Sequence, residues 1–133
     1  MSAYGSLAAS YDRLTSDVPY AEILASVQAL LTERGVAPRS VLDLACGTGT
    51  MSLLLAQSGY QVIGADMSEE MLTVAYDKAS ALPDNRPFFV CQRMERLCLP
   101  DPVDWVLCCL DSINYLTDPA ACQETFRRVY RSL

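Results

Sequence analysis

The chain has 133 residues, of which 51% are hydrophobic and 20% are charged, and its net charge is -6. This length and composition are typical of one globular domain and exclude a disordered or fibrous protein. Apolar stretches fall far short of the roughly 20 residues of a membrane-spanning helix, and residues 1–10 lack the basic and apolar parts of a signal peptide. We therefore expect residues 1–133 to form one cytoplasmic domain without membrane contact.

Charge and cysteine usage narrow the classes of partner and site. An acidic chain repels a phosphate backbone, and the basic cluster Arg127, Arg128 and Arg131 fits a solvated helix face, so nucleic acid is not the expected partner. The six cysteines contain no C-x-x-C pair and histidine is absent, so we predict no metal site. Because several cysteines lie in apolar runs, we expect buried free thiols rather than disulfides.

The first predicted element is a helix from about Pro19 to Arg34, with Asp17 as a candidate N-cap and Gly35 as its stop. Strands and helices alternate after it. The strands are predicted at Ser40–Ala45, Gln61–Ala65, Phe88–Cys91 and Asp104–Leu110. The intervening helices end near Ser58 and Leu82, the second capped by Ser68. A last helix begins at Asp118 and Pro119 and carries a predicted inward stripe of Cys122, Phe126, Val129, Tyr130 and Leu133.

This alternation predicts an α/β fold, a Rossmann-like, doubly wound parallel sheet with right-handed crossovers. We expect an incomplete sheet of about four strands in the order 3-2-1-4. Such a sheet binds ligands beyond the carboxyl ends of its strands, where the strand order reverses. The first strand and the glycine loop Cys46–Thr50 after it are therefore the expected site.

The loop contains Gly47 and Gly49, where a ligand can approach the backbone without meeting a side chain. Asp43 precedes them inside an otherwise apolar strand, where an unpartnered carboxylate is costly. It needs a cationic or hydrogen-bonding partner. A ligand with an ammonium group would supply one, while the loop amides and the helix dipole would receive the carboxylate of the same ligand.

The second strand closes on Asp66, whose carboxylate is placed to accept both hydroxyls of a ribose. Met67 offers a flat, polarizable flank for a base. An amino acid site beside a nucleoside site describes S-adenosylmethionine (SAM). An alternative interpretation is that Asp66 only begins the turn before Ser68.

On these residues the sequence resembles class I SAM-dependent methyltransferases, close to a bacterial subgroup of small enzymes. Asp43, Gly47 and Gly49 match the D-x-x-x-G-x-G signature, and further matches are Tyr11-Asp12, Gln92–Glu95 and Cys109–Leu116. The resemblance implies a set of SAM-binding residues: Tyr11, Asp43, Cys46, Gly47, Gly49, Asp66, Met67, Met94 and Leu110. It also places Asp111, Asn114 and Tyr115 beside the methyl acceptor, with Asp111 or Tyr115 as the candidate proton acceptor.

Two departures from the family pattern matter. Arg93 stands where the family usually has an acid that accepts a hydrogen bond from adenine, and arginine has no acceptor. The family's sheet usually continues through three more strands, whereas this sequence reaches Leu133 after the helix that follows the fourth strand. An uncovered apolar edge on that strand predicts homodimerisation or aggregation.

Three functions stay open at this stage. The first is methyl transfer to a small-molecule acceptor, since the acidic balance and the lack of an asparagine-proline-proline-aromatic pattern disfavour nucleic acid. The second is a truncated or degenerate fragment that binds SAM without catalysis. The third is an NAD-dependent oxidoreductase, although its fingerprint requires a third glycine where this chain has Ser52, and it gives Asp43 no purpose.

Overall fold

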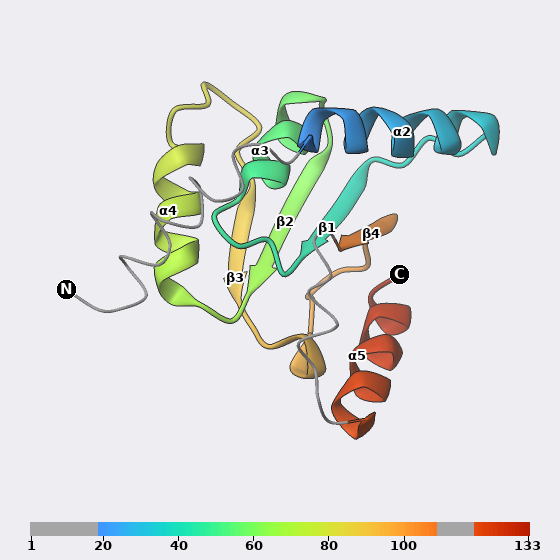
Figure 1. Ribbon diagram of the computed structural model, residues 1–133, viewed down its shortest axis with the longest axis vertical. Helices are drawn as coiled ribbons and strands as arrows, with labels where there is room; N and C mark the ends of the chain where they lie inside the picture. Colours follow the sequence, from blue (N-terminus) through green and yellow to red (C-terminus); the bar gives the residue numbers. More distant parts are fainter. Residues whose placement is uncertain (1–18, 109–118) are drawn as a thin grey trace.

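The structure, a computed structural model, describes residues 19–108 and 119–133, with side chains in the second segment at residues 124 and 127–133. Its centre is a four-stranded parallel sheet in the order β3-β2-β1-β4 (Figure 1). The strands are β1 (Ser40–Leu44), β2 (Gln61–Asp66), β3 (Phe88–Cys91) and β4 (Trp105–Cys108). The predicted doubly wound order is thereby confirmed, and β1 stands between β2 and β4 at the point where the strand order reverses.

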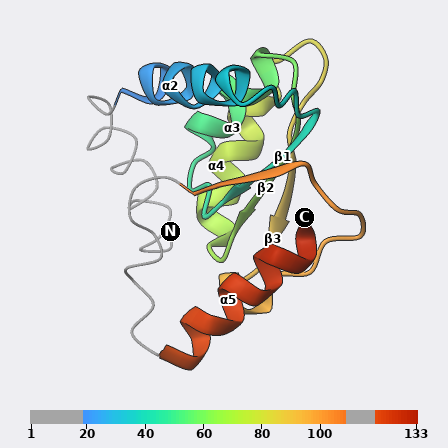
Figure 2. The same cartoon turned by 90° about the vertical axis from the view of Figure 1, so that its right-hand side faces the viewer.

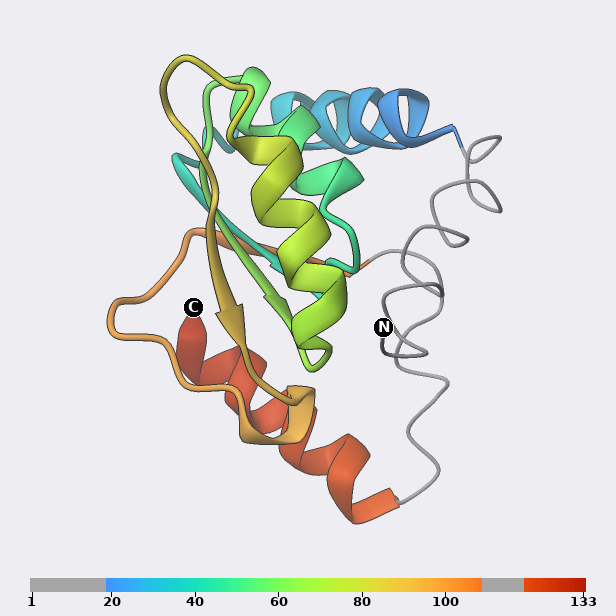
Figure 3. The same ribbon diagram turned by 90° about the vertical axis from the view of Figure 1, so that its left-hand side faces the viewer.

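Helices cover both faces of this sheet. The helices are α2 (Tyr20–Glu33), α3 (Thr50–Gln57), α4 (Glu69–Ala79) and α5 (Pro119–Ser132), together with a short 3-10 helix η1 (Met94–Arg96) that the sequence did not predict. Figures 2 and 3 show α2, α3 and α4 on one side of the sheet and α5 on the other. Within residues 19–108 and 119–133, no helix is long and apolar enough to cross a membrane.

Alternation along the strands divides the core into two clusters. Val41 packs with Leu24 of α2 and with Met51 and Leu55 of α3. Leu42 and Leu44 belong to the cluster beneath the opposite face, to which α5 contributes Val129. Because successive side chains of a strand point to opposite faces, Asp43 shares the α3 face with Val41. The first strand therefore aims its single acid at the helix that follows the glycine loop.

The helix ends agree in part with the predictions. Ser68 caps α4, since its Oγ accepts a hydrogen bond from the Met71 amide at 3.2 Å, as predicted. At α2 the N-cap position is Pro19, which makes no side-chain cap; the predicted cap, Asp17, lies outside the described residues.

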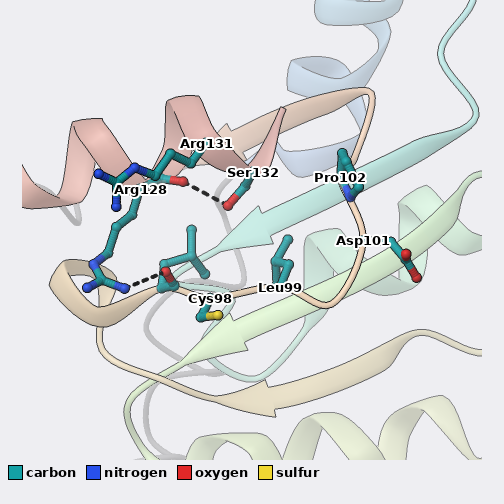
Figure 4. A pocket seen from close by; sticks show the side chains of 8 residues that line it. Cys98, Leu99, Asp101, Pro102, Arg128, Arg131 and Ser132 are labelled. Carbon is teal, nitrogen blue, oxygen red and sulfur yellow. Dashed lines mark hydrogen bonds between the residues drawn. The ribbon is translucent and has the colours of Figure 1, made fainter.

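The predicted inward stripe of α5 is wrong at its end. Tyr130 is 81% exposed and Leu133 53% exposed, whereas Ser132 is buried. The helix is anchored by polar contacts instead: the Arg128 guanidinium donates to the Leu97 carbonyl at 3.1 Å (Figure 4), and the Ser132 carbonyl accepts from the Val103 amide at 2.8 Å. These contacts turn the Arg128, Val129 and Ser132 side of α5 inward. The side chains of Cys122 and Phe126 lie outside the described residues.

The described cysteines are free thiols, but two of them contradict the predicted burial. Cys46 and Cys108 are partly buried, whereas Cys91 and Cys98 are exposed. Cys91 ends β3, an outer strand of the described sheet, and Cys98 lies in the loop after η1. Cys91 lines an open groove beside α4 and Cys98 lies outside the strands, so both thiols stay exposed. Cys109 and Cys122 fall outside the described residues or side chains.

Gly64 of β2 has a packing reason for lacking a side chain, which the sequence analysis did not detect. A Cβ added there would lie 2.6 Å and 2.7 Å from ring carbons of Phe89 and 3.1 Å from the Cys46 sulfur. The Phe89 ring therefore occupies the space that a side chain at Gly64 would fill.

We predict that Gly64→Ala destabilises the fold by about 2–3 kcal/mol, because overpacking forces the Phe89 ring or the strand to move. The measurement is urea unfolding followed by the fluorescence of Trp105, the single tryptophan, which packs edge-on against Tyr60. Gly35→Ala is the control, since its φ is +68° but nothing lies within 4 Å of an added Cβ; it should lose about 1 kcal/mol. Equal losses in the two variants would contradict the packing argument.

Candidate functional site

The chain turns sharply between the end of β1 and the start of α3. Ala45, Gly47 and Gly49 all have positive φ, at 57°, 57° and 81°. Glycine adopts this conformation readily, whereas a residue with a Cβ loses roughly 1–2 kcal/mol there. The strain at Ala45 therefore falls at the carboxyl edge of the sheet, where strained backbone commonly accompanies function.

Three amides of this turn, those of Cys46, Gly47 and Gly49, donate to protein acceptors. Cys46 donates to the Ala65 carbonyl at 2.9 Å, Gly47 to Asp66 Oδ2 at 2.9 Å, and Gly49 to the Cys46 carbonyl at 3.0 Å. In this structure the Gly47 and Gly49 amides donate to protein acceptors, and the expectation that they receive a ligand carboxylate stays a prediction. Their hydrogen bonds tie the loop to β2.

Gly49 also has a packing requirement. A Cβ at this position would lie 2.8 Å from the Cβ of Ala75 in α4 and 3.4 Å from the Phe89 ring. The loop therefore packs closely against α4, and both its glycines are buried. Sequence reasoning assigned Gly49 to ligand approach and missed this contact, whose partners lie far along the chain.

Asp43 is 2% exposed and finds its partner in α3. The Ser52 hydroxyl, itself fully buried, donates to Asp43 Oδ2 at 2.6 Å. Burial nevertheless raises the pKa of Asp43 to about 7; the Ser52 hydrogen bonds lower it, and the charge of Asp66 raises it. Ser52, where a dinucleotide fingerprint has its third glycine, is thus the missing partner of the strand acid. The signal that could have revealed it was this pairing of an acid in the strand with a hydroxyl in the first turn of the following helix.

Asp66 lies between the glycine loop and the turn into α4. Its Oδ2 accepts from the Gly47 amide and its Oδ1 from the Ser68 amide, both at 2.9 Å. A carboxylate has about four acceptor sites, so each oxygen keeps capacity for a further donor. Met67, next to it, is 64% exposed. Both residues lie at the carboxyl end of β2, and the nucleoside site stays a prediction.

The segment after β3 is held beside β2. The Gln92 amide donates to the Asp66 carbonyl at 2.9 Å, and its side chain makes two hydrogen bonds to the backbone of Cys98, at 2.9 Å and 3.0 Å. This clamp closes the loop that contains η1 and positions Met94, which packs against the second core cluster. Arg93 is exposed and pairs with Glu95 at 2.7 Å. The sequence did not indicate the bridging role of Gln92.

Cys46 lies inside the same turn. Its sulfur is 3.8 Å from the Gly47 carbonyl, to which the thiol donates. Burial raises the pKa of the Cys46 thiol, and the charges of Asp43 and Asp66 raise it further. Because the nucleophilic form of cysteine is the thiolate, Cys46 acts as a packing residue.

The structure brings together one half of the predicted site. The residues at or just after the carboxyl ends of β1, β2 and β3 are Asp43, Cys46, Gly47, Gly49, Asp66, Met67 and Met94. Tyr11, Leu110, Asp111, Asn114 and Tyr115 lie outside the described residues, so the acceptor half stays a prediction. In the described part of the chain, no group of three or more histidine, cysteine or acidic side chains could hold a metal ion.

Comparison with known proteins identifies the family. A family model described as a methyltransferase domain matches residues 41–133. The chain belongs to this methyltransferase family. A Bacillus subtilis (strain 168) protein named as a methyltransferase, YqeM, is 41% identical over 132 residues, which are 98% of this chain and 51% of that protein. The magnesium-protoporphyrin O-methyltransferase of Synechocystis is 36% identical over 107 residues, covering 78% of this chain and 46% of that enzyme.

Solved structures of methyltransferases share the fold of this chain. A SAM-dependent methyltransferase from Clostridium acetobutylicum ATCC 824 superposes with a TM-score of 0.85 at 30% identity, covering 99% of this chain and 54% of that one. Magnesium protoporphyrin IX methyltransferase from Synechocystis PCC 6803, solved with bound SAM, superposes with a TM-score of 0.67 at 31% identity. The match covers 83% of this chain and 52% of that one. The chain thus spans about half the length of the relatives it matches.

We predict that Asp43 makes the fold less stable as the pH rises. Its folded pKa of about 7 exceeds the ordinary value of 3.8, so the folded chain binds more protons than the unfolded chain between these values. The free energy of unfolding should therefore fall between about pH 4 and pH 7, on the order of 4 kcal/mol in total, and level off above. The measurement is urea unfolding across this range for wild type and Asp43→Asn, which lacks the titration. Parallel curves for the two proteins would contradict the prediction.

Proposed function

We propose that this chain is the SAM-binding unit of a methyltransferase, spanning residues 1–133, and that it acts on a small-molecule acceptor. The observation that carries the proposal is the pair of acids at the switch point of the sheet. Asp43 is buried and feels the like charge of Asp66, and the partner that offsets this is the neutral hydroxyl of Ser52. A cation bound here would relieve both the burial and the repulsion.

The chemistry of SAM fits this arrangement. Its ammonium and sulfonium groups are positive, and its ribose offers two hydroxyl donors. Asp43 supplies negative charge beneath the loop, and Asp66 keeps acceptor capacity on both oxygens. The exposed Met67 and the clamped Met94 are placed to flank the base. SAM carries an activated methyl group, so the protein's task is to align donor and acceptor and to exclude water.

The names of relatives support a small-molecule acceptor. They include the ubiquinone biosynthesis O-methyltransferase of Idiomarina loihiensis, 35% identical over 89 residues, and the magnesium-protoporphyrin enzyme already described. The net charge of -6 disfavours nucleic acid. In this proposal Tyr11 and Leu110 complete the donor site, and Asp111 or Tyr115 takes the proton of the acceptor. Arg93 cannot accept a hydrogen bond from the adenine amino group, so in this proposal Glu95 accepts it. Glu95 forms an ion pair with Arg93 at 2.7 Å.

Calorimetric titration with SAM tests the donor site. Because a bound cation lowers the pKa of Asp43, binding should release a proton below about pH 7, and the affinity should rise with pH and level off above that value. Asp43→Asn should weaken binding about tenfold or more and remove both the proton release and the pH dependence.

Two further variants complete this test. Asp66→Asn should also weaken binding, whereas Asp101→Asn, at an exposed position away from the site, should bind as wild type does. A panel of phenolic, enolic and amine acceptors then tests turnover. Binding without turnover would favour the alternative of a fragment that only binds SAM. Binding of NAD in place of SAM would overturn the proposal.

The outer edge of β4 suggests self-association. All four of its residues are only partly buried, and in the described sheet β4 pairs with β1 alone. Unpaired apolar edges promote pairing between chains. We therefore propose a homodimer through β4, although a further strand of a longer chain would satisfy the same edge.

For this chain, sedimentation velocity should show a monomer that converts to a dimer as concentration rises. The outward amides within Trp105–Cys108 should exchange more slowly in the dimer, because a partner strand accepts their hydrogen bonds. A single monomeric species at every concentration would contradict the proposed edge pairing.

A further inference from the structure

An open groove lies between α4 and β3, two elements that stand side by side in Figure 3. It has a volume of about 320 Å³. Leu72 and Phe89 supply apolar surface within it, and Tyr76, which is 69% exposed, forms an apolar wall. This space accepts one or two large apolar side chains.

The polar residues of the groove are mainly acidic. Glu69 and Asp77 line it together with Thr73 and Cys91, and none of the lining residues is basic. Burial raises the pKa of the Cys91 thiol, and the charges of Glu69, Asp66 and Glu70 raise it further. The groove is therefore a region of negative potential, which complements a cationic partner.

The strand beside the groove offers backbone for pairing. β3 pairs with β2 on one side, and in the described part of the sheet no strand pairs with its other side. Phe89 and Cys91 point into the groove, so Phe88 points to the opposite face, where it is 68% exposed. Apolar edge strands without a lysine or proline are receptive to strand addition, in which the backbone gives affinity and alternate side chains give specificity.

We propose that the α4/β3 groove is a docking site for an extended, basic segment of another protein, which adds to the edge of β3 and seats an apolar side chain over Phe89. A second copy of this chain fits less well, because a chain of net charge -6 would meet an acidic groove. The groove adjoins the donor site, because the Cys91 thiol donates to the Met67 carbonyl at 3.5 Å, but neither Asp43 nor Asp66 lines it. The proposal therefore goes beyond the methyltransferase function.

The test is binding of a fluorescein-labelled peptide that alternates lysine with isoleucine, measured by fluorescence anisotropy on the whole chain. We expect saturable binding that weakens with salt. Glu69→Gln combined with Asp77→Asn should weaken it about fivefold, the effect of two screened surface charges. The matched control is Asp84→Asn with Asp101→Asn, which removes the same charge from exposed positions outside the groove and should leave binding unchanged.

A second variant removes the apolar wall without touching charge. Tyr76→Ala should also weaken the peptide, and since Tyr76 is mostly exposed the fold should persist, as Trp105 fluorescence would verify. In wild type the peptide should slow amide exchange along β3. Equal weakening in the two charge variants, no protection of β3, or equal binding of a peptide that alternates glutamate with isoleucine would each overturn the proposal.

Discussion

The hydrogen bond between Ser52 and Asp43 is the interaction on which the site depends. It joins Asp43, near the carboxyl end of β1, to the first turn of α3, and both side chains are buried. Because the Ser52 hydroxyl is neutral, it gives the Asp43 carboxylate a hydrogen bond without cancelling its charge. The pKa of Asp43 therefore stays raised. A basic residue in place of Ser52 would have lowered the pKa of Asp43 and left no demand for a cation. The chain therefore retains an acid whose charge is only partly compensated at the place where the sheet opens to ligands.

Close approach of the backbone at two glycines fixes the geometry around this acid. Gly49 lets the loop contact Ala75, and Gly64 makes room for the Phe89 ring, which reaches Gly49 as well. One aromatic side chain of β3 thus packs against both the second strand and the glycine loop. The amide hydrogen bonds of Cys46, Gly47 and Gly49 also hold the turn. The packing of the two glycines and these hydrogen bonds together keep the strained Ala45 in place, as a preorganised site requires.

Sequence patterns predicted what local spacing determines and missed what distant contacts determine. The strand order follows from alternating elements and right-handed crossovers, and the Ser68 cap follows from its place before an acidic first turn. The commitment of the loop amides could not be foreseen, because their acceptors Ala65 and Asp66 belong to the next strand. The predicted burial of Tyr130 was wrong because polar contacts, rather than apolar periodicity, set the rotation of α5 about its axis. The predicted burial of Cys91 was wrong because β3 is an outer strand of the described sheet, and an apolar run in the sequence does not reveal that position.

Charge at the switch point separates the two cofactor classes that share this fold. A dinucleotide carries a pyrophosphate, which such sheets bind with free loop amides at a helix N-terminus. Here the amides of Gly47 and Gly49 already donate to protein acceptors, one of them to a carboxylate. Asp43 and Asp66 add negative charge within reach of each other. The two acids would repel an anionic ligand, and the Gly47 and Gly49 amides are not free to bind it. A ligand with a sulfonium and an ammonium group would instead offset the burial of Asp43 and its repulsion by Asp66. The electrostatics of the first two strands therefore favour a methyl donor over a nicotinamide cofactor, independently of the family match.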